Sequence, residues 1–161
     1  MLTYDDEDGR EKKKTIPKEA KIIYNGLAHP DYSDSLFDIK TGSIELIMND
    51  DKVECVKINS GENYRLAKLY DNKLYFKNTS FSINLDDTNV EYDIVDKNNK
   101  PVDTDKLSEN NVLSVLTARD MNDSFTYYKI IVSRKAVSGS VNSTNSSDRE
   151  VNVDGTEYRM A

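Results

Sequence analysis

Short runs of β-branched and aromatic residues recur about every ten residues along this chain, and clusters of Asn, Asp and Gly separate them. No segment places apolar residues at the 3.6-residue spacing of a helix over three turns. Strands at this spacing, joined by tight turns, are typical of small β-barrels and β-sandwiches. The sequence therefore predicts an all-β fold built from hairpins, as small barrels or a sandwich, with one or two short helical turns.

Two hairpins give the strongest signals. The first joins residues 43–48 to 52–58 through the acidic turn 49–51, and the second joins 112–118 to 125–133 through a polar tip. A shorter run at 21–24 ends at Asn25-Gly26, the strongest two-residue turn signal. Further strands are predicted at residues 64–69, 73–76, 81–85 and 90–95, and helical turns near 34–37 and within 104–110.

The alternation of apolar and polar residues within these runs selects the side chains that face the interior, because successive side chains of a strand point to opposite faces. The predicted core positions are Ile22, Ile44, Leu46, Val56, Ile58, Leu66, Phe76, Ile83, Ile94, Val115, Ile130 and Val132.

Length and charge exclude several classes of protein. The 161 residues are enough for one ordinary domain or two small ones, and the formal net charge is −7. This charge argues against a nucleic-acid partner bound through its phosphates and against an anionic membrane surface. A single Cys excludes an internal disulfide and a Cys-rich zinc site. The sequence predicts neither a membrane span nor a signal peptide.

Two pairs of matching phrases indicate an internal repeat. GENYRLA at residues 61–67 matches GTEYRMA at 155–161, and TGSI at 41–44 matches SGSV at 138–141, about 95 residues later. The sequence stops within a strand of the second copy, so we expect the chain to be part of a longer tandem array. The predicted division is an N-terminal segment, 1–40, that completes a first β unit, a repeat unit, 41–136, and the opening hairpin of a next repeat, 137–161.

The phrases AKIIYNG (residues 20–26), TGSIELI (41–47), LSENNVLSV (107–115) and VSRKAVSGSV (132–141) carry a family resemblance. Together they resemble an interior β-rich repeat module of clostridial surface proteins that carry S-layer-homology or copper-amine-oxidase-N-terminal-like domains. The resemblance implies a secreted or wall-associated protein without catalytic activity, located outside the cell or in the cell wall. It transfers no functional residue, because the family pattern offers none.

The side chains needed for catalysis are few. His29, the only His, lies beside a proline in a polar loop, where it needs a partner carboxylate to act as a base. Cys55 lies between Glu54 and Val56 in a hairpin strand, with no adjacent basic residue to lower its pKa, which favours an inert thiol. We therefore expect no enzymatic activity, no catalytic residue and no bound organic cofactor.

Acidic turns are the candidate metal sites, because Ca²⁺ prefers several carboxylate and carbonyl oxygens. The candidate ligands are Asp50, Asp51, Asp120 and Asp123. The acidic segments 5–8 and 86–87 offer similar oxygens, and none of these segments completes the spaced pattern of a strong calcium loop. Asp and Asn also dominate ordinary hairpin turns, so turn formation is the alternative interpretation.

Ten tyrosines and no tryptophan raise the question of a sugar-stacking platform. The candidate rings, on or beside predicted strands, are Tyr64, Tyr70, Tyr75, Tyr127 and Tyr128. Because adjacent residues of a strand face opposite sides, one of the pair Tyr127-Tyr128 should face the core and the other should face outward. Packing within and between strands is the alternative role of these rings.

The sequence thus favours a non-catalytic spacer module of a repetitive cell-surface or secreted protein. The alternative is a β module that binds calcium or carbohydrate weakly. The expected partners are the neighbouring domains of the same chain and cell-wall polysaccharide, with no nucleic acid and no membrane span in this segment.

Overall fold

The computed structural model describes residues 2–5, 8–29, 32–39, 42–122, 124–133 and 137–159. Its regular structure is β-strand throughout, apart from two isolated 3-10 turns, η1 (Asp34–Phe37) and η2 (Thr104–Lys106). The sheets curl into a half-barrel, which confirms the predicted all-β class. Both 3-10 turns also lie where the sequence predicts helical turns.

The strands of the described residues form three sheets. An N-terminal hairpin pairs β1 (Leu2–Asp5) with β2 (Glu11–Lys14), and a separate C-terminal sheet contains β12 (Val141–Asn145), β13 (Glu150–Val153) and β14 (Thr156–Arg159). The main sheet contains β3 (Lys21–Tyr24), β4 (Leu27–His29), β5 (Gly42–Asn49), β6 (Lys52–Tyr70), β7 (Lys73–Phe76), β8 (Ser82–Asn84), β9 (Val90–Asp96), β10 (Val112–Arg119) and β11 (Thr126–Ser133).

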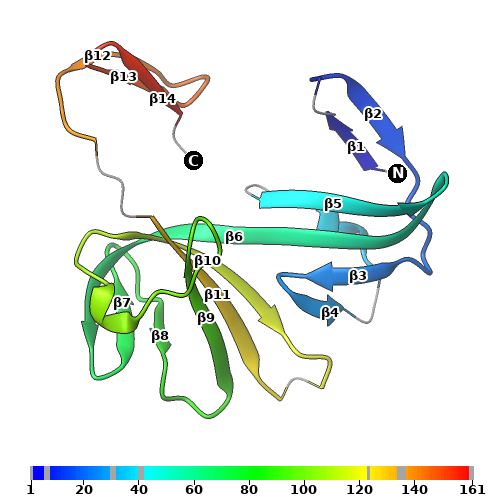
Figure 1. Ribbon diagram of the computed structural model, residues 1–161, viewed down its shortest axis with the longest axis horizontal. Helices are drawn as coiled ribbons and strands as arrows, with labels where there is room; N and C mark the ends of the chain where they lie inside the picture. The colour runs from blue at the N-terminus through cyan, green and yellow to red at the C-terminus, as the bar shows by residue number, and fades with distance from the viewer. Residues whose placement is uncertain are drawn as a thin grey trace.

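Strand β6 corrects one prediction. The sequence suggests two strands, 52–58 and 64–69, but the structure has one strand of 19 residues that runs the length of the main sheet (Figure 1). The intervening segment, Asn-Ser-Gly-Glu-Asn at 59–63, has the composition of a turn. It stays extended because Gly61, Glu62 and Asn63 pair with β10, about 50 residues further along the chain.

Different strands pair with successive parts of β6. On one edge, β5 pairs antiparallel with β6 as far as Ser60, and β7 pairs with it from Leu66 onward. On the other edge, β3 pairs in parallel as far as Ile58, and β10 pairs antiparallel from Gly61 to Arg65. Figure 1 shows the result, with β3, β4 and β5 around one half of β6 and β7 to β11 around the other.

Two apolar clusters form the interior, one at each half of β6. The first contains Ile16, Ala20, Ile22, Val53, Val56 and Ile58. The second contains Leu66, Leu74, Phe76, Ile83, Leu85, Ile94, Leu113, Val115, Ile130 and Val132. Every predicted core residue is buried except Ile44 and Leu46, which are half-buried and pack against the first cluster. Both lie on β5, whose outer edge has no partner strand among the described residues.

The two copies of the repeated phrase adopt different conformations. Gly61 lies within β6, whereas Gly155 has φ +83° and occupies the turn between β13 and β14. The first copy is held extended by β10, and β13 instead pairs back onto β14. The residues of β12 are all exposed. The division into segments 1–40, 41–136 and 137–161 remains a prediction.

Candidate functional site

Asn25 lies where the strand paired with one edge of β6 changes from β3 to β10. The side-chain amide of Asn25 donates from Nδ2 to the carbonyl oxygens of Ser60 (2.8 Å) and Thr117 (2.7 Å). Its Oδ1 accepts from the Ser60 N–H at 2.8 Å. The amide therefore bonds as a peptide group would and joins β3, β6 and β10 at one point.

Local sequence chemistry places Asn25 there. Asn25 (φ 51°) and Gly26 (φ 96°) both adopt the left-handed conformation that a two-residue hairpin turn requires. The Asn25 N–H also donates to the Ile58 carbonyl at 2.8 Å, so the turn begins at the edge of β6. Asn25 is only 1% exposed, and all of its side-chain polar atoms are hydrogen-bonded. An unpaired amide at this depth would be costly.

Gly61 permits the close approach of β10 at the same point. A Cβ atom on Gly61 would lie 2.6 Å from the Val115 carbonyl oxygen, closer than real contacts of this kind. The pairing of β10 with β6 therefore requires glycine at position 61.

A groove lies beside this junction, with a cavity volume of about 820 Å³. Its lining combines aromatic rings with amide and charged side chains, and includes Tyr24, Tyr64, Phe81, Asp38, Glu62, Asn63 and Arg149. Such a mixture can stack against an apolar ring face and hydrogen-bond to hydroxyl groups.

Tyr64 connects the groove with the second core. Its ring lies 4.9 Å from that of Phe76 and 5.0 Å from that of Phe81, so it belongs to an aromatic cluster at the groove wall. Its hydroxyl donates a hydrogen bond to the Glu62 carboxylate. Burial, with a further contribution from this hydrogen bond, raises the pKa of Tyr64 to about 12. Tyr64 therefore presents a neutral donor, with Glu62 as its acceptor, throughout the physiological range.

The described calcium candidates lie in two different hairpin turns, Asp50 and Asp51 between β5 and β6 and Asp120 between β10 and β11. Asp50 has φ 49°, a conformation that the turn requires, so turn formation is sufficient to explain this residue. Asp51 lies 3.8 Å from Lys14 Nζ. Asp123 lies outside the described residues. No three His, Cys, Asp or Glu side chains among the residues described form a group that could hold a metal ion.

Asp120 has a clear structural role at the tip of the second hairpin. Its carboxylate accepts hydrogen bonds from the backbone N–H groups of Asn122 (3.1 Å), Ser124 and Phe125 (3.0 Å). The Ser124 hydroxyl donates to it as well, at 2.8 Å. These donors lower the pKa of Asp120, with the Phe125 N–H contributing most. Both oxygens are thus engaged within the loop itself.

The other candidate residues are dispersed. His29 ends β4, where its ring lies 6.3 Å from that of Tyr24. Cys55 is a half-buried free thiol on β6. The tyrosine pair separates as predicted: Tyr128 packs against the second core, while Tyr127 turns to the other side, where its hydroxyl donates to Asp93 at 2.6 Å.

Tyr70 and Tyr75 lie together on the outward face of the β6–β7 hairpin, each beside a lysine side chain. The sequence indicates these rings but not their lysine partners. It also identifies Asn25 only as a turn residue. The local signal for that turn is strong, but the bonds to Ser60 and Thr117 cross 35 and 92 residues of chain, and no local pattern encodes them.

Comparison with known proteins gives no relative: no family model, curated protein or solved structure matches this chain. Within the described part of the chain, no helix has the length and apolar character needed to cross a membrane.

Proposed function

We propose that this chain is a non-catalytic structural module that acts as a rigid spacer in a repetitive cell-surface or secreted protein. The observation that carries the proposal is β6, a single strand of 19 residues that contributes to both cores. At about 3.3 Å per residue, such a strand is about 60 Å long.

Rigidity follows from the pairing of β6. Along β6, pairing with β5 ends at Ser60 and pairing with β10 begins at Gly61. Pairing with β10 ends at Arg65, and pairing with β7 begins at Leu66. Asn25 adds three hydrogen bonds at the first of these transitions. A hinge needs a stretch of backbone with few such bonds, and the junction offers none among the described residues.

The proposed location is the cell wall or the extracellular medium, as the resemblance to interior modules of clostridial surface proteins implies. The proposed partners are the neighbouring domains of the same chain. A spacer in that setting keeps functional domains apart and needs solubility, to which the net charge of −7 contributes.

Single-molecule force spectroscopy tests the spacer role, with the chain held between two marker domains of known unfolding length. If β6 joins the two cores into one body, residues 21–133 unfold in one event that releases about 400 Å of chain, at about 3.6 Å per residue. Two separate shorter events, one for each core, would contradict the proposal.

Weak carbohydrate binding in the central groove is a second candidate function. It is favoured by the combination of Tyr24, Tyr64 and Glu62 along one groove. Titration with neutral cell-wall oligosaccharides should shift the amide signals of residues 60–64 while those of β14 stay fixed. Unchanged signals at 60–64 at millimolar sugar would remove this candidate.

A further inference from the structure

The outward face of the β6–β7 hairpin carries a charge opposite to that of the chain as a whole. In the register of the hairpin, Lys68 lies opposite Tyr75, and Tyr70 lies opposite Lys73. These four side chains share one face, because the alternating residue Leu74 is fully buried on the other. Lysine and tyrosine thus alternate both along and across the two strands.

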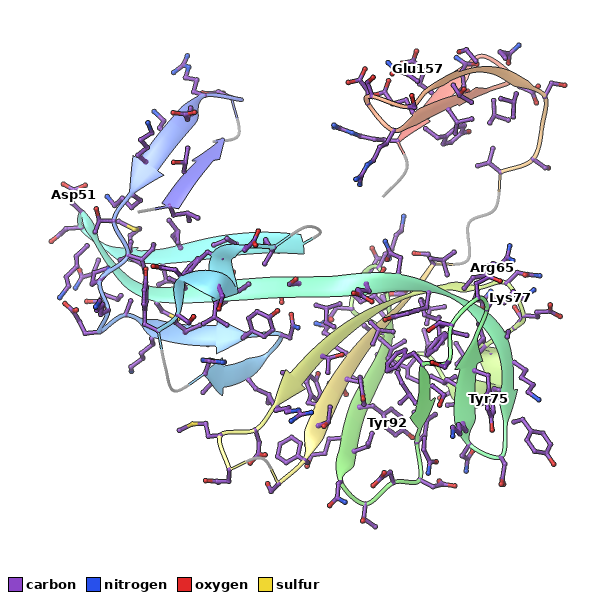
Figure 2. The ribbon with its side chains drawn as sticks, turned by 180° about the vertical axis from the view of Figure 1, so that it is seen from behind. Asp51, Arg65, Tyr75, Lys77, Tyr92 and Glu157 are labelled. Carbon is purple, nitrogen blue, oxygen red and sulfur yellow. The ribbon has the colours of Figure 1, made fainter. Side chains whose placement is uncertain are left out.

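Two further cations extend this face toward the open end of the hairpin. The Lys77 N–H donates to the Arg65 carbonyl at 2.8 Å, which makes the two residues cross-strand neighbours. Figure 2 shows Arg65, Lys77 and Tyr75 at the same end of the molecule. Lys77, and to a smaller extent Arg65, lower the pKa of Glu109, to which the Lys77 ammonium is bonded at 2.6 Å.

We call these residues the basic hairpin face: Arg65, Lys68, Tyr70, Lys73, Tyr75 and Lys77. Between residues 65 and 77 the sequence has one acidic residue, Asp71, and it lies in the turn. Four cations therefore lie within one short hairpin of a protein whose net charge is −7.

The two central lysines are held in place yet remain available to a ligand. Lys68 Nζ lies 5.0 Å from the ring centroid of Tyr75 and 5.5 Å from that of Tyr70, and Lys73 Nζ lies 5.4 Å from that of Tyr75. Among the residues that the structure describes, neither lysine forms an ion pair. A ring face attracts an ammonium group but leaves its N–H donors free for oxygen acceptors.

We propose that the basic hairpin face binds an acidic polysaccharide. The ammonium groups of Lys68 and Lys73 pair with carboxylates of the polymer, and the ring of Tyr70, which is 66% exposed, packs against a sugar ring. A nucleic-acid duplex fits less well, because it carries one phosphate charge per about 1.7 Å, a density that four cations on one hairpin do not match. The proposal does not rest on the spacer role or on the central groove, since neither uses these side chains.

Affinity electrophoresis in gels that contain polygalacturonate tests the proposal, with dextran as the neutral polymer. The wild-type chain should be retarded by polygalacturonate and not by dextran, and added salt should weaken the retardation. The double variant Lys68→Gln/Lys73→Gln should bind about tenfold more weakly, because it loses two exposed charge pairs.

The matched control is Lys52→Gln/Lys57→Gln, which removes the same charge from the other half of β6 and should retain wild-type binding. Tyr70→Ala, at an exposed position, tests the stacking role without a change in charge and should also weaken binding. Circular dichroism and the urea midpoint of each variant verify folding.

Three results would overturn the proposal. The first is a wild-type chain that polygalacturonate does not retard, or that dextran retards equally. The second is an equal loss of binding in the Lys52/Lys57 control, which would show a general charge effect. The third is tighter binding of single-stranded DNA through Lys68 and Lys73, which would assign the face to a nucleic acid.

Discussion

Replacing Asn25 with glycine isolates the side chain that joins β3, β6 and β10. Glycine accepts the positive φ of the turn, so the variant keeps the hairpin geometry and removes only the amide. It removes the side-chain partner of three part-buried backbone groups: the N–H and the carbonyl of Ser60 and the carbonyl of Thr117.

The expected loss of stability follows from these three hydrogen bonds. A typical intramolecular hydrogen bond contributes about 1 kcal/mol net, which gives a loss of about 3 kcal/mol for Asn25→Gly. For a chain of this length, a change of that size lowers Tm by about 6–12 °C.

Urea unfolding followed by circular dichroism measures the effect, because a shift of the midpoint at constant slope reports a change in stability. Asn99→Gly is the matched control. Asn99 also has a positive φ of 62° in a turn, but its side chain is exposed and forms no hydrogen bond with another described residue. If Asn25→Gly and Asn99→Gly have the same urea midpoint, the role assigned to the Asn25 amide is wrong.

Three further predictions concern the same structure. Gly61→Ala should destabilise the chain by about 2 kcal/mol, because the new Cβ overpacks against the Val115 carbonyl. Urea unfolding beside the wild-type chain measures this loss, and equal midpoints would contradict it. Stability should fall as the pH rises from 10 to 12, because folding raises the pKa of Tyr64 and of Tyr127 to about 12. Ultraviolet titration of the tyrosinates measures these pKa values, and ionisation of all ten tyrosines together near pH 10 would refute the prediction. Calcium should leave Tm unchanged, because hydrogen bonds within the tip of the β10–β11 hairpin already engage the Asp120 carboxylate. A Tm several degrees higher with calcium than in a chelated sample would restore the calcium interpretation.

Much of the strand content could be predicted because its signals are local. The hairpin of β10 and β11 follows from two β-prone runs around a polar tip, and the turn at Asn25-Gly26 follows from its two residue types. The burial of Ile58 and Ile130 follows from alternation. These features depend on a few residues at a time.

The continuity of β6 could not be predicted in the same way. Residues 59–63 have turn-forming side chains, and only their pairing with β10 keeps them extended. The parallel pairing of β3 with β6, and of β9 with β11, likewise joins strands that are far apart in the sequence. The groove and the role of Asn25 depend on these pairings, so both became visible only in the structure.

The basic hairpin face lies between these two cases. Its alternation of Lys68, Tyr70, Lys73 and Tyr75 around the turn Asp71-Asn72 is present in the sequence. Whether these side chains face outward depends on the bulge between Leu66 and Lys68, which changes the phase of the alternation. No local pattern indicates that bulge.

The central claim is that β6 joins two cores into one rigid body, and residual dipolar couplings of the backbone amides test it most directly. One set of couplings comes from residues 52–58, in the first half of β6. The other comes from residues 112–118 of β10, which pairs with the second half of β6, and from residues 126–133 of β11, which pairs with β10. Both sets should fit a single alignment tensor. Two tensors of different magnitude or orientation would show that the halves move independently, and the rigid-spacer role would then be wrong.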